Sequence, residues 1–385
     1  MGNRYTTITE GFDWGPAITK IILNLDKEFY NTKIISNNFK VISTRKLSNE
    51  NKVFTSERSI INCYLNNNDS ITLELEVGPE LYEGSPFTYN TLTNYNEYVE
   101  TTYKIFLNNN QLTIDFAGNV NLIADDFIHN IPFKHNNIQL NYAYFTPQKD
   151  TEYNKVPLII WLHGAGEGGE NTYITVLGNK VTNLTKYGAY VLVPQTPTIW
   201  MDANGTKTYN TSVPSNNGTS WYTEALMALI REFIEKTSQI DLSRIYIGGC
   251  SNGGFMTVNM LMTYPDFFSA AFPIATPYLP HWLTSERILA IKDKPIWFTH
   301  AKTDTTVVID QEVDIHTTLL YNKLKEANGK NIHYSLFDKI EDINTNYEYN
   351  GHFSWVPALN DQCTPQINGK EISLFEWLFT HSNNQ

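Results

Sequence analysis

Cysteine is scarce in this sequence. Three cysteines occur among 385 residues, at positions 63, 250 and 363. Their odd number and wide spacing fit neither a disulfide framework nor a zinc site. We expect buried free thiols, and a single Cys63–Cys363 bridge is the alternative.

Positive charge is also in short supply. Lysine and arginine total 28 against 40 aspartate and glutamate residues, which gives a formal net charge of −12. This charge repels nucleic acid and anionic membrane surfaces, so neither is an expected partner.

Long apolar runs are missing as well. The longest, such as Val156–Leu162 (VPLIIWL), have the length of a strand, so we expect no membrane span. Residues 1–16 lack the apolar core of a signal peptide. A secreted protein without its signal peptide would begin in the same way.

The sequence does contain enough apolar residues for two folded domains. Apolar residues make up 41% of the chain and aromatic residues 13%, so sizeable cores can form. The residue pattern changes near position 119. We therefore predict one domain over residues 1–118 and a second over residues 119–385.

Residues 1–118 have an all-β pattern. Short segments rich in β-branched and aromatic residues are separated by polar turns, two of them rich in asparagine, which tolerates positive φ. The pattern predicts an immunoglobulin-like β-sandwich. The expected strands are 17–26, 39–46, 58–66, 70–77, 98–108 and 111–118.

Residues 119–385 alternate strands with helices, which predicts an α/β fold with a mostly parallel central sheet. Near-continuous apolar runs at 156–164 and 189–197 are typical of parallel strands covered on both faces. Helical periodicity is found at 221–237 and 312–329.

A candidate nucleophile lies in the stretch Gly249–Gly253 (GCSNG), which fits the pattern G-x-S-x-G. An expected strand precedes it and an expected helix follows. This is the context of a nucleophile elbow in the α/β-hydrolase fold, and the helix N-terminus offers free N–H groups to a developing oxyanion. A structural turn that happens to contain Ser251 is the alternative.

Two reactive side chains are adjacent here, Cys250 and Ser251. Successive residues at a sharp turn point in different directions, so only one faces a cleft. The motif assigns that position to Ser251. We expect Cys250 to be a small buried residue of low reactivity.

The candidate base is His352. A serine nucleophile needs a base and an orienting acid, and in this fold the chain order is Ser, then Asp or Glu, then His. His352 lies in a loop (YNGHFSW) after the last expected strand and before the last expected helix. A surface histidine is the alternative reading.

The candidate acid is Asp304, which directly follows the expected strand KPIWFTH. Loops at the carboxyl ends of parallel strands hold the site in such sheets. His300 ends that strand and is suited to support the acid loop. Asp310 and Asp314 lie at the entry to a helix and are interpreted as capping residues.

The loop His163–Gly169 (HGAGEGG) follows the first buried strand of the second domain. In this fold the loop supplies an oxyanion donor, so we expect the backbone N–H groups of Ala165 and Asn252 to form the oxyanion hole. His163 and Glu167 are expected to hold the loop by hydrogen bonds rather than to take part in catalysis.

No metal or cofactor is expected. The stretch 342–353 begins like a calcium loop but lacks its glycine and its closing glutamate. Trp221 follows a long polar segment, so it can line a substrate cleft. Packing of Trp221 on the core is an equally good alternative.

The motifs LHGAGEGG, SRIYIGGCSNGG, HAKTD and GHFSW resemble those of carboxylesterases related to prolyl oligopeptidase-like and polyhydroxyalkanoate-depolymerase-like hydrolases. The opening GFDWGPAITKIILNLD resembles the N-terminal immunoglobulin-like domain of bacterial two-domain esterases. The resemblance implies a triad of Ser251, Asp304 and His352. Such families often have Ser and Met beside the nucleophile, whereas this chain has Cys250 and Asn252, so its acyl pocket can differ.

The expected activity is hydrolysis of carboxylic esters. The resemblance implies small short-chain or aryl esters, or polymers such as polyesters and esterified polysaccharides, and it implies secretion, with a cytoplasmic location as the alternative. A prolyl oligopeptidase-like peptidase and a non-catalytic binding protein are the competing functions. The sequence leaves open whether the sandwich binds polymer, supports a homo-oligomer or partly covers the cleft.

Overall fold

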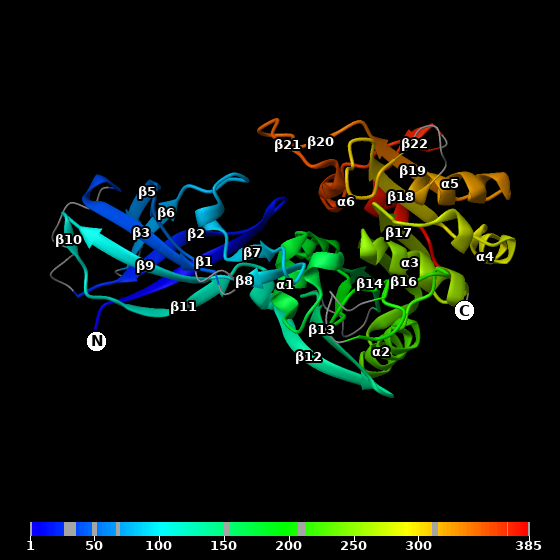
Figure 1. Cartoon of the computed structure of the whole chain (residues 1–385), viewed down its shortest axis with the longest axis horizontal. Helices are drawn as coiled ribbons and strands as arrows, with labels where there is room; N and C mark the ends of the chain where they lie inside the picture. Colours follow the sequence, from blue (N-terminus) through cyan, green and yellow to red (C-terminus); the bar gives the residue numbers. More distant parts are fainter. Residues whose placement is uncertain are drawn as a thin grey trace. The chain divides into compact units, whose positions relative to one another are not determined.

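The chain folds into two compact units in the computed structural model (Figure 1), namely Met1–Leu92 with Asn96–Asp126, and Thr93–Tyr95 with Phe127–Gln385. The structure describes residues 2–26, 36–47, 52–66, 70–148, 155–206, 213–309, 315–367 and 369–383. Asp310 and Asp314, the expected capping residues, lie outside this part of the chain.

The boundary between the units differs from the predicted one. Position 118 falls inside β11 (Asp115–Asn121), which pairs in parallel with β1 (Arg4–Phe12). Because this pairing ties residues up to 121 into the first sheet, the first unit extends to Asp126.

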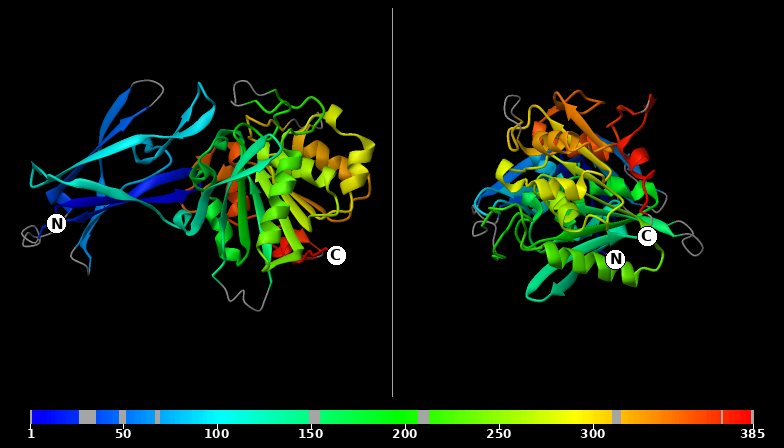
Figure 2. Two further views of the ribbon diagram at one scale, coloured as in Figure 1. Left: turned by 90° about the horizontal axis from the view of Figure 1, so that it is seen from below. Right: turned by 90° about the vertical axis from the view of Figure 1, so that its right-hand side faces the viewer.

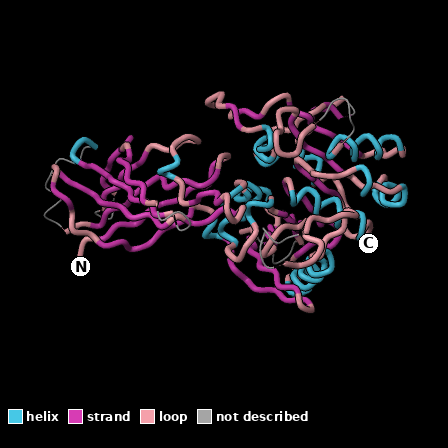
Figure 3. Tube along the Cα trace, in the orientation of Figure 1, coloured by secondary structure: helices cyan, strands magenta, loops and turns pink. Residues whose placement is uncertain are grey.

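The first unit is built mainly from strands, as Figure 3 shows, and forms the predicted β-sandwich. One sheet has the order β11-β1-β2-β6-β5 and the other β10-β9-β3-β4. Their apolar faces share one core, in which Ile21 and Leu73 of one sheet meet Val41 and Ile105 of the other. The remaining strands are β2 (Gly15–Asn24), β3 (Phe39–Lys46), β4 (Val53–Arg58), β5 (Ile60–Leu65), β6 (Ile71–Leu75), β9 (Glu100–Leu107) and β10 (Asn110–Gln111), with β7 (Phe87–Asn90) and β8 (Tyr95–Tyr98) as a separate ribbon.

One of the asparagine-rich turns joins β9 to β10. Asn108 and Asn109 have φ of 48° and 66°, the left-handed conformation that asparagine tolerates. The turn therefore forms for the reason that the sequence suggested. Residues 67–69 of the other asparagine-rich turn lie outside the described residues.

The second unit contains an eight-stranded sheet with the order β12-β13-β15-β14-β16-β17-β18-β19. The strands from β15 to β19 pair in parallel, and β13 pairs antiparallel with both β12 and β15. The predicted α/β fold with a mostly parallel sheet is confirmed. The strands are β12 (Phe127–His135), β13 (Ile138–Phe145), β14 (Val156–Leu162), β15 (Tyr190–Gln195), β16 (Ile240–Cys250), β17 (Ala270–Ile274), β18 (Ile296–Ala301) and β19 (Ile332–Phe337).

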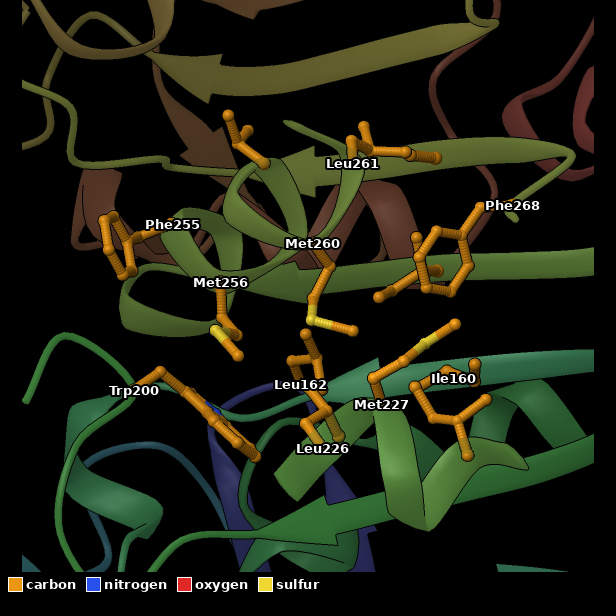
Figure 4. Packing of buried hydrophobic residues seen from close by; sticks show 14 of the residues in the cluster. Ile160, Leu162, Trp200, Leu226, Met227, Phe255, Met256, Met260, Leu261 and Phe268 are labelled. Carbon is orange, nitrogen blue, oxygen red and sulfur yellow. The ribbon is translucent and has the colours of Figure 1, made fainter. Parts of the chain in front are cut away.

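Helices cover both faces of this sheet (Figure 2). On one face, Ile160 and Leu162 of β14 pack against Leu226 and Met260 in a large apolar cluster (Figure 4). On the other face, Phe272 packs on Phe375, with ring centroids 5.5 Å apart. The helices are α1 (Thr172–Gly178), α2 (Thr223–Lys236), α3 (Asn252–Thr263), α4 (Ser285–Ile291), α5 (His316–Glu326), α6 (Trp355–Leu359) and α7 (Leu374–Leu378).

Within the described residues, no helix combines the length and the apolar character needed to cross a bilayer. The three cysteines are free thiols, and Cys63 lies in the first unit whereas Cys363 is buried in the second. The alternative of a Cys63–Cys363 bridge is therefore not seen.

Candidate active site

Ser251 sits at the sharp turn between β16 and α3. Its φ of 54° and ψ of −117° lie outside the regions that ordinary residues favour, so the backbone is strained at this residue. Close packing enforces the turn, because a Cβ on Gly253 would lie 2.0 Å from the Leu162 carbonyl oxygen, and one on Gly249 would lie 2.4 Å from it. The predicted strand–turn–helix is present.

Cys250 is the last residue of β16 and is 1% exposed. Burial, with a smaller contribution from the nearby Glu167 carboxylate, raises the pKa of the Cys250 thiol well above its ordinary value. The thiol therefore stays protonated in the interior, and this disfavours Cys250 as a nucleophile.

Asp304 follows β18 and is 3% exposed. Its Oδ1 accepts hydrogen bonds from the backbone N–H groups of Thr306 and Val307, both at 2.8 Å. Its Oδ2 accepts from His300 Nε2 at 2.9 Å and from His352 Nδ1 at 2.8 Å. Burial alone would raise the pKa of Asp304, but the hydrogen bonds from the two histidines outweigh it and hold the pKa well below its usual range.

His352 lies in the short 3-10 helix η9 (Gly351–Phe353), which follows β21 (Glu348–Tyr349). The Asn350 side chain fixes the start of this turn by accepting a hydrogen bond of 2.9 Å from the His352 backbone N–H. With Nδ1 bonded to Asp304, Nε2 is the ring nitrogen left to accept a proton.

The structure thus brings Asp304 and His352 into contact, while the Ser251 hydroxyl has no hydrogen-bond partner among the described residues. Ser251 and Asp304 follow β16 and β18, which flank β17 in the sheet. Strands in a sheet lie about 4.8 Å apart, so these strand ends are separated by roughly 10 Å. This is a gap that an imidazole can bridge, and serine–histidine hydrogen bonds often tighten only when substrate binds.

Ala165 and Asn252 lie at the two loops expected to bind an oxyanion. Ala165 begins the 3-10 helix η5 (Ala165–Glu167), and Asn252 begins α3. N–H groups in the first turn of a helix have no intrahelical acceptor, and in the described part of the chain neither of these two N–H groups donates a hydrogen bond. The preceding strands are neighbours in the sheet, with Leu162 opposite Gly249.

His163 is fully buried and uses both ring nitrogens to hold the loop. Nδ1 donates to the Gly164 carbonyl at 2.6 Å, and Nε2 accepts from the Thr196 N–H at 3.2 Å. Burial lowers its pKa to about 4, so the ring is neutral at neutral pH. Glu167 is also buried, and its backbone carbonyl accepts a hydrogen bond of 2.9 Å from the Gln195 side chain.

Trp221 is 47% exposed, so the alternative of core packing does not describe it. It lines a hollow of about 390 Å³ together with Gly169, Glu170 and Pro197, which belong to the loops that follow β14 and β15. The lining of this hollow includes none of the three candidate triad residues.

Two further contacts had no signal in the sequence. The Asn252 side chain accepts a hydrogen bond of 3.2 Å from the Met201 N–H, which fixes the loop after β15 to the elbow. Thr317 approaches His300 from the start of α5.

Asp342 of the calcium-like stretch uses Oδ1 to accept from two backbone N–H groups of its own loop.

Two protein families match this chain. Residues 4–115 match the esterase Ig-like N-terminal domain, and residues 149–337 match the phospholipase/carboxylesterase family. The crystal structure of a thermostable esterase is similar over 98% of this chain and 99% of that chain, with a TM-score of 0.73 and 25% identity.

Curated relatives match over shorter segments. Poly(3-hydroxyalkanoate) depolymerase C of Paucimonas lemoignei is 34% identical over 125 residues, which cover 31% of this chain and 27% of the relative. Feruloyl esterase B of Neurospora crassa is 29% identical over 133 residues, which cover 34% of this chain and 42% of the relative. Each alignment therefore spans less than half the length of the curated relative.

Proposed function

We propose that this chain, which belongs to the two-domain esterases that join an Ig-like N-terminal domain to a phospholipase/carboxylesterase domain, hydrolyses carboxylic esters through an acyl-enzyme on Ser251. The observation that carries the proposal is the 2.8 Å hydrogen bond between His352 Nδ1 and the buried Asp304 carboxylate, which follows β18, two strands away from β16 and the Ser251 turn. This bond fixes the imidazole tautomer whose Nε2 can act as a base.

The reaction begins when Ser251 Oγ attacks the ester carbonyl carbon and its proton passes to His352 Nε2. Asp304 stabilises the imidazolium, and the N–H groups of Ala165 and Asn252 bind the oxyanion, each contributing on the order of 3 kcal/mol. His352 then protonates the leaving alcohol as the C–O bond breaks. Water, deprotonated by His352, attacks the acyl-enzyme and releases the acid and Ser251.

Replacing Ser251 by alanine tests the proposal. Ser251→Ala should abolish turnover of p-nitrophenyl acetate and labelling by a fluorophosphonate probe. Cys250→Ala is the matched control, because Cys250 is the adjacent reactive residue and is buried. If folded Ser251→Ala kept its turnover, or if Cys250→Ala lost it, the proposal would be wrong. Turnover of peptide anilides instead of aryl esters would point to a peptidase.

We also propose that Trp221 binds the part of the substrate beyond the scissile ester. Its indole is fixed by packing on Gly205, where a Cβ would lie 2.2 Å from Trp221 Nε1, yet the ring stays half exposed. The row Asn137, Gln139 and Asn141 lines the same hollow with amide groups. A flat ring and amide groups that line one hollow suit the aryl group or sugar ring of a larger ester.

Trp221→Ala should raise KM for feruloyl and acetylated-oligosaccharide esters by about tenfold, which corresponds to 1.4 kcal/mol, and leave KM for p-nitrophenyl acetate unchanged. An equal change for small and large esters would contradict this role.

A polyester film assay would show whether polymers of the kind named for the depolymerase relative are substrates.

Secretion is part of the proposal, on the strength of the motif resemblance alone. Detection of the protein in the culture medium of its source organism, with a cytoplasmic enzyme as the lysis control, would support it. Retention in the cell fraction would contradict it.

A further inference from the structure

A second histidine is bonded to the candidate acid. His300, in β18, is fully buried, and its Nε2 lies 2.9 Å from Asp304 Oδ2. The same oxygen lies 2.8 Å from His352 Nδ1. One carboxylate oxygen therefore receives two imidazole N–H groups, although the proposed reaction uses only one imidazole.

The hydrogen bonds continue from His300 to Thr317, in the first turn of α5. Thr317 Oγ1 lies 2.9 Å from His300 Nδ1 and accepts a 3.0 Å hydrogen bond from the Thr276 N–H. Because the ionised Asp304 accepts from Nε2, the His300 tautomer with its hydrogen on Nε2 accepts at Nδ1, and Thr317 is then the donor. The Thr276 carbonyl, at 3.3 Å, is the more distant competing acceptor for this hydroxyl.

Backbone strain marks both ends of this network. Ala275 precedes Thr276 and has φ of 45°, and His316 precedes Thr317 and has φ of 59°. Such conformations are unfavourable for residues other than glycine and persist only where the surrounding structure imposes them. The His316 ring accepts a hydrogen bond of 3.0 Å from the Tyr278 N–H, and this bond helps to hold the strained backbone at His316.

We propose that His300, with its tautomer fixed by Thr317, is a positioning residue that orients the Asp304 carboxylate toward His352. The His300 bond occupies one lone pair of Oδ2 and leaves the other for His352 Nδ1. Together with the two backbone bonds to Oδ1, it prevents rotation of the carboxylate. The inference rests on the proposed ester hydrolysis.

The principal test replaces His300 by leucine. In His300→Leu we expect kcat for p-nitrophenyl acetate to fall by about 10- to 100-fold with little change in KM. The acid limb of the kcat/KM profile should move to higher pH, because a carboxylate with one donor fewer stabilises the His352 imidazolium more strongly. The titratable groups that act on this cluster are Asp304, His352 and His316.

A conservative variant separates positioning from folding. His300→Gln keeps an N–H near the place of Nε2, so it should recover most of kcat and the position of the acid limb. Thr317→Val, which removes the donor to Nδ1, should lower kcat in the same direction by a smaller factor, and Thr317→Ser should restore it. These threonine variants also keep the proposal testable if His300→Leu fails to fold.

His333→Leu is the matched control. His333 lies on β19 opposite Trp297 of β18, and its ring is hydrogen-bonded to Asn331. The variant should keep the kcat and the acid limb of the wild type per folded molecule. Wild-type kinetics in His300→Leu, or equal losses in His300→Leu and His300→Gln with an unmoved acid limb, would overturn the proposal. Activity in Ser251→Ala would instead overturn the proposed hydrolysis itself.

Discussion

The two sides of the candidate site are built in opposite ways. On the acid side, both oxygens of Asp304 have all their hydrogen bonds made within the protein. On the nucleophile side, Ser251 is held by a strained backbone, and the two candidate oxyanion donors are unbonded within the described residues. On the acid side, complete hydrogen bonding orients the carboxylate. On the nucleophile side, backbone N–H groups stay free to bind a substrate.

Loss of the Asp304 carboxylate on the acid side should lower kcat more than any other substitution described below. Asp304→Asn keeps the shape of the side chain, but its amide nitrogen cannot accept from His352, so the imidazole is held in the wrong tautomer. We expect kcat for p-nitrophenyl acetate to fall on the order of 10⁴-fold. Asp338→Asn is the control, because Asp338 is exposed and pairs with Lys302. More than a tenth of the wild-type kcat in Asp304→Asn would show that the acid side is not essential.

On the nucleophile side, close backbone packing should be the most sensitive feature. Gly253→Ala would place a methyl group 2.0 Å from the Leu162 carbonyl oxygen. Neither β14 nor α3 can easily move to relieve this clash. We expect a loss of about 3 kcal/mol or more in the free energy of unfolding, measured by urea denaturation. Gly78→Ala, where the nearest atom is 3.8 Å away, should change it little. Equal stability of the two variants would contradict the tight turn.

The nucleophile side should depend on the backbone of Asn252 more than on its side chain. Asn252→Ala keeps the N–H and loses the hydrogen bond from Met201. We expect the free energy of unfolding to fall by about 1 kcal/mol and kcat to fall by less than about tenfold. Loss of an oxyanion donor, in contrast, lowers kcat by about 10²–10³-fold. A loss above 100-fold would assign a direct role to the side chain.

The two sides should also differ, more modestly, in how their contributions to folding stability depend on pH. Burial lowers the pKa of His163 to about 4, below its unfolded value of about 6.5. Its contribution to stability is therefore present above pH of about 6.5 and lost as the pH falls toward 4. The pKa of Asp304 is also lowered, and its contribution is lost only below about pH 4.

Urea unfolding between pH 3 and 7 would measure these two windows. His163→Gln should flatten the fall in stability in the upper window, and Asp304→Asn should flatten it in the lower window. If His163→Gln left the upper window unchanged, burial would not lower the pKa of the His163 ring as described above.

The fold was predictable where local pattern and burial agree. The continuous apolar run at β14 and the helical periodicity of apolar residues in α2 predicted elements that the structure contains. By contrast, β1 was missed, because its threonine-rich sequence shows no apolar alternation. Its place depends on pairing with β11, more than 100 residues away. For the same reason the predicted domain boundary at 118/119 fell inside β11.

At the candidate site, the order of motifs along the chain identified the candidate residues, but it did not predict the hydrogen bonds between them. Ser251, Asp304 and His352 were chosen from motif and loop position, and their catalytic roles stay predictions. The exposure of Trp221 could not be read from its neighbours in the chain, because helix-start aromatic residues occur both in cores and at cleft walls.

Local residue patterns indicated the strand–turn–helix around Ser251 and most of the alternating strands and helices of the second unit, because apolar periodicity acts through near neighbours in the chain. The glycines at 249 and 253 mark the turn, but the contact that requires them is with the Leu162 carbonyl, far away in the sequence. Three properties of the site come from the three-dimensional fold: the His163 ring accepts a hydrogen bond from Thr196, the Asn252 side chain accepts one from Met201, and Asp304 Oδ2 is shared by His300 and His352. These properties depend on burial and on hydrogen bonds between segments far apart in the chain, which no local pattern encodes.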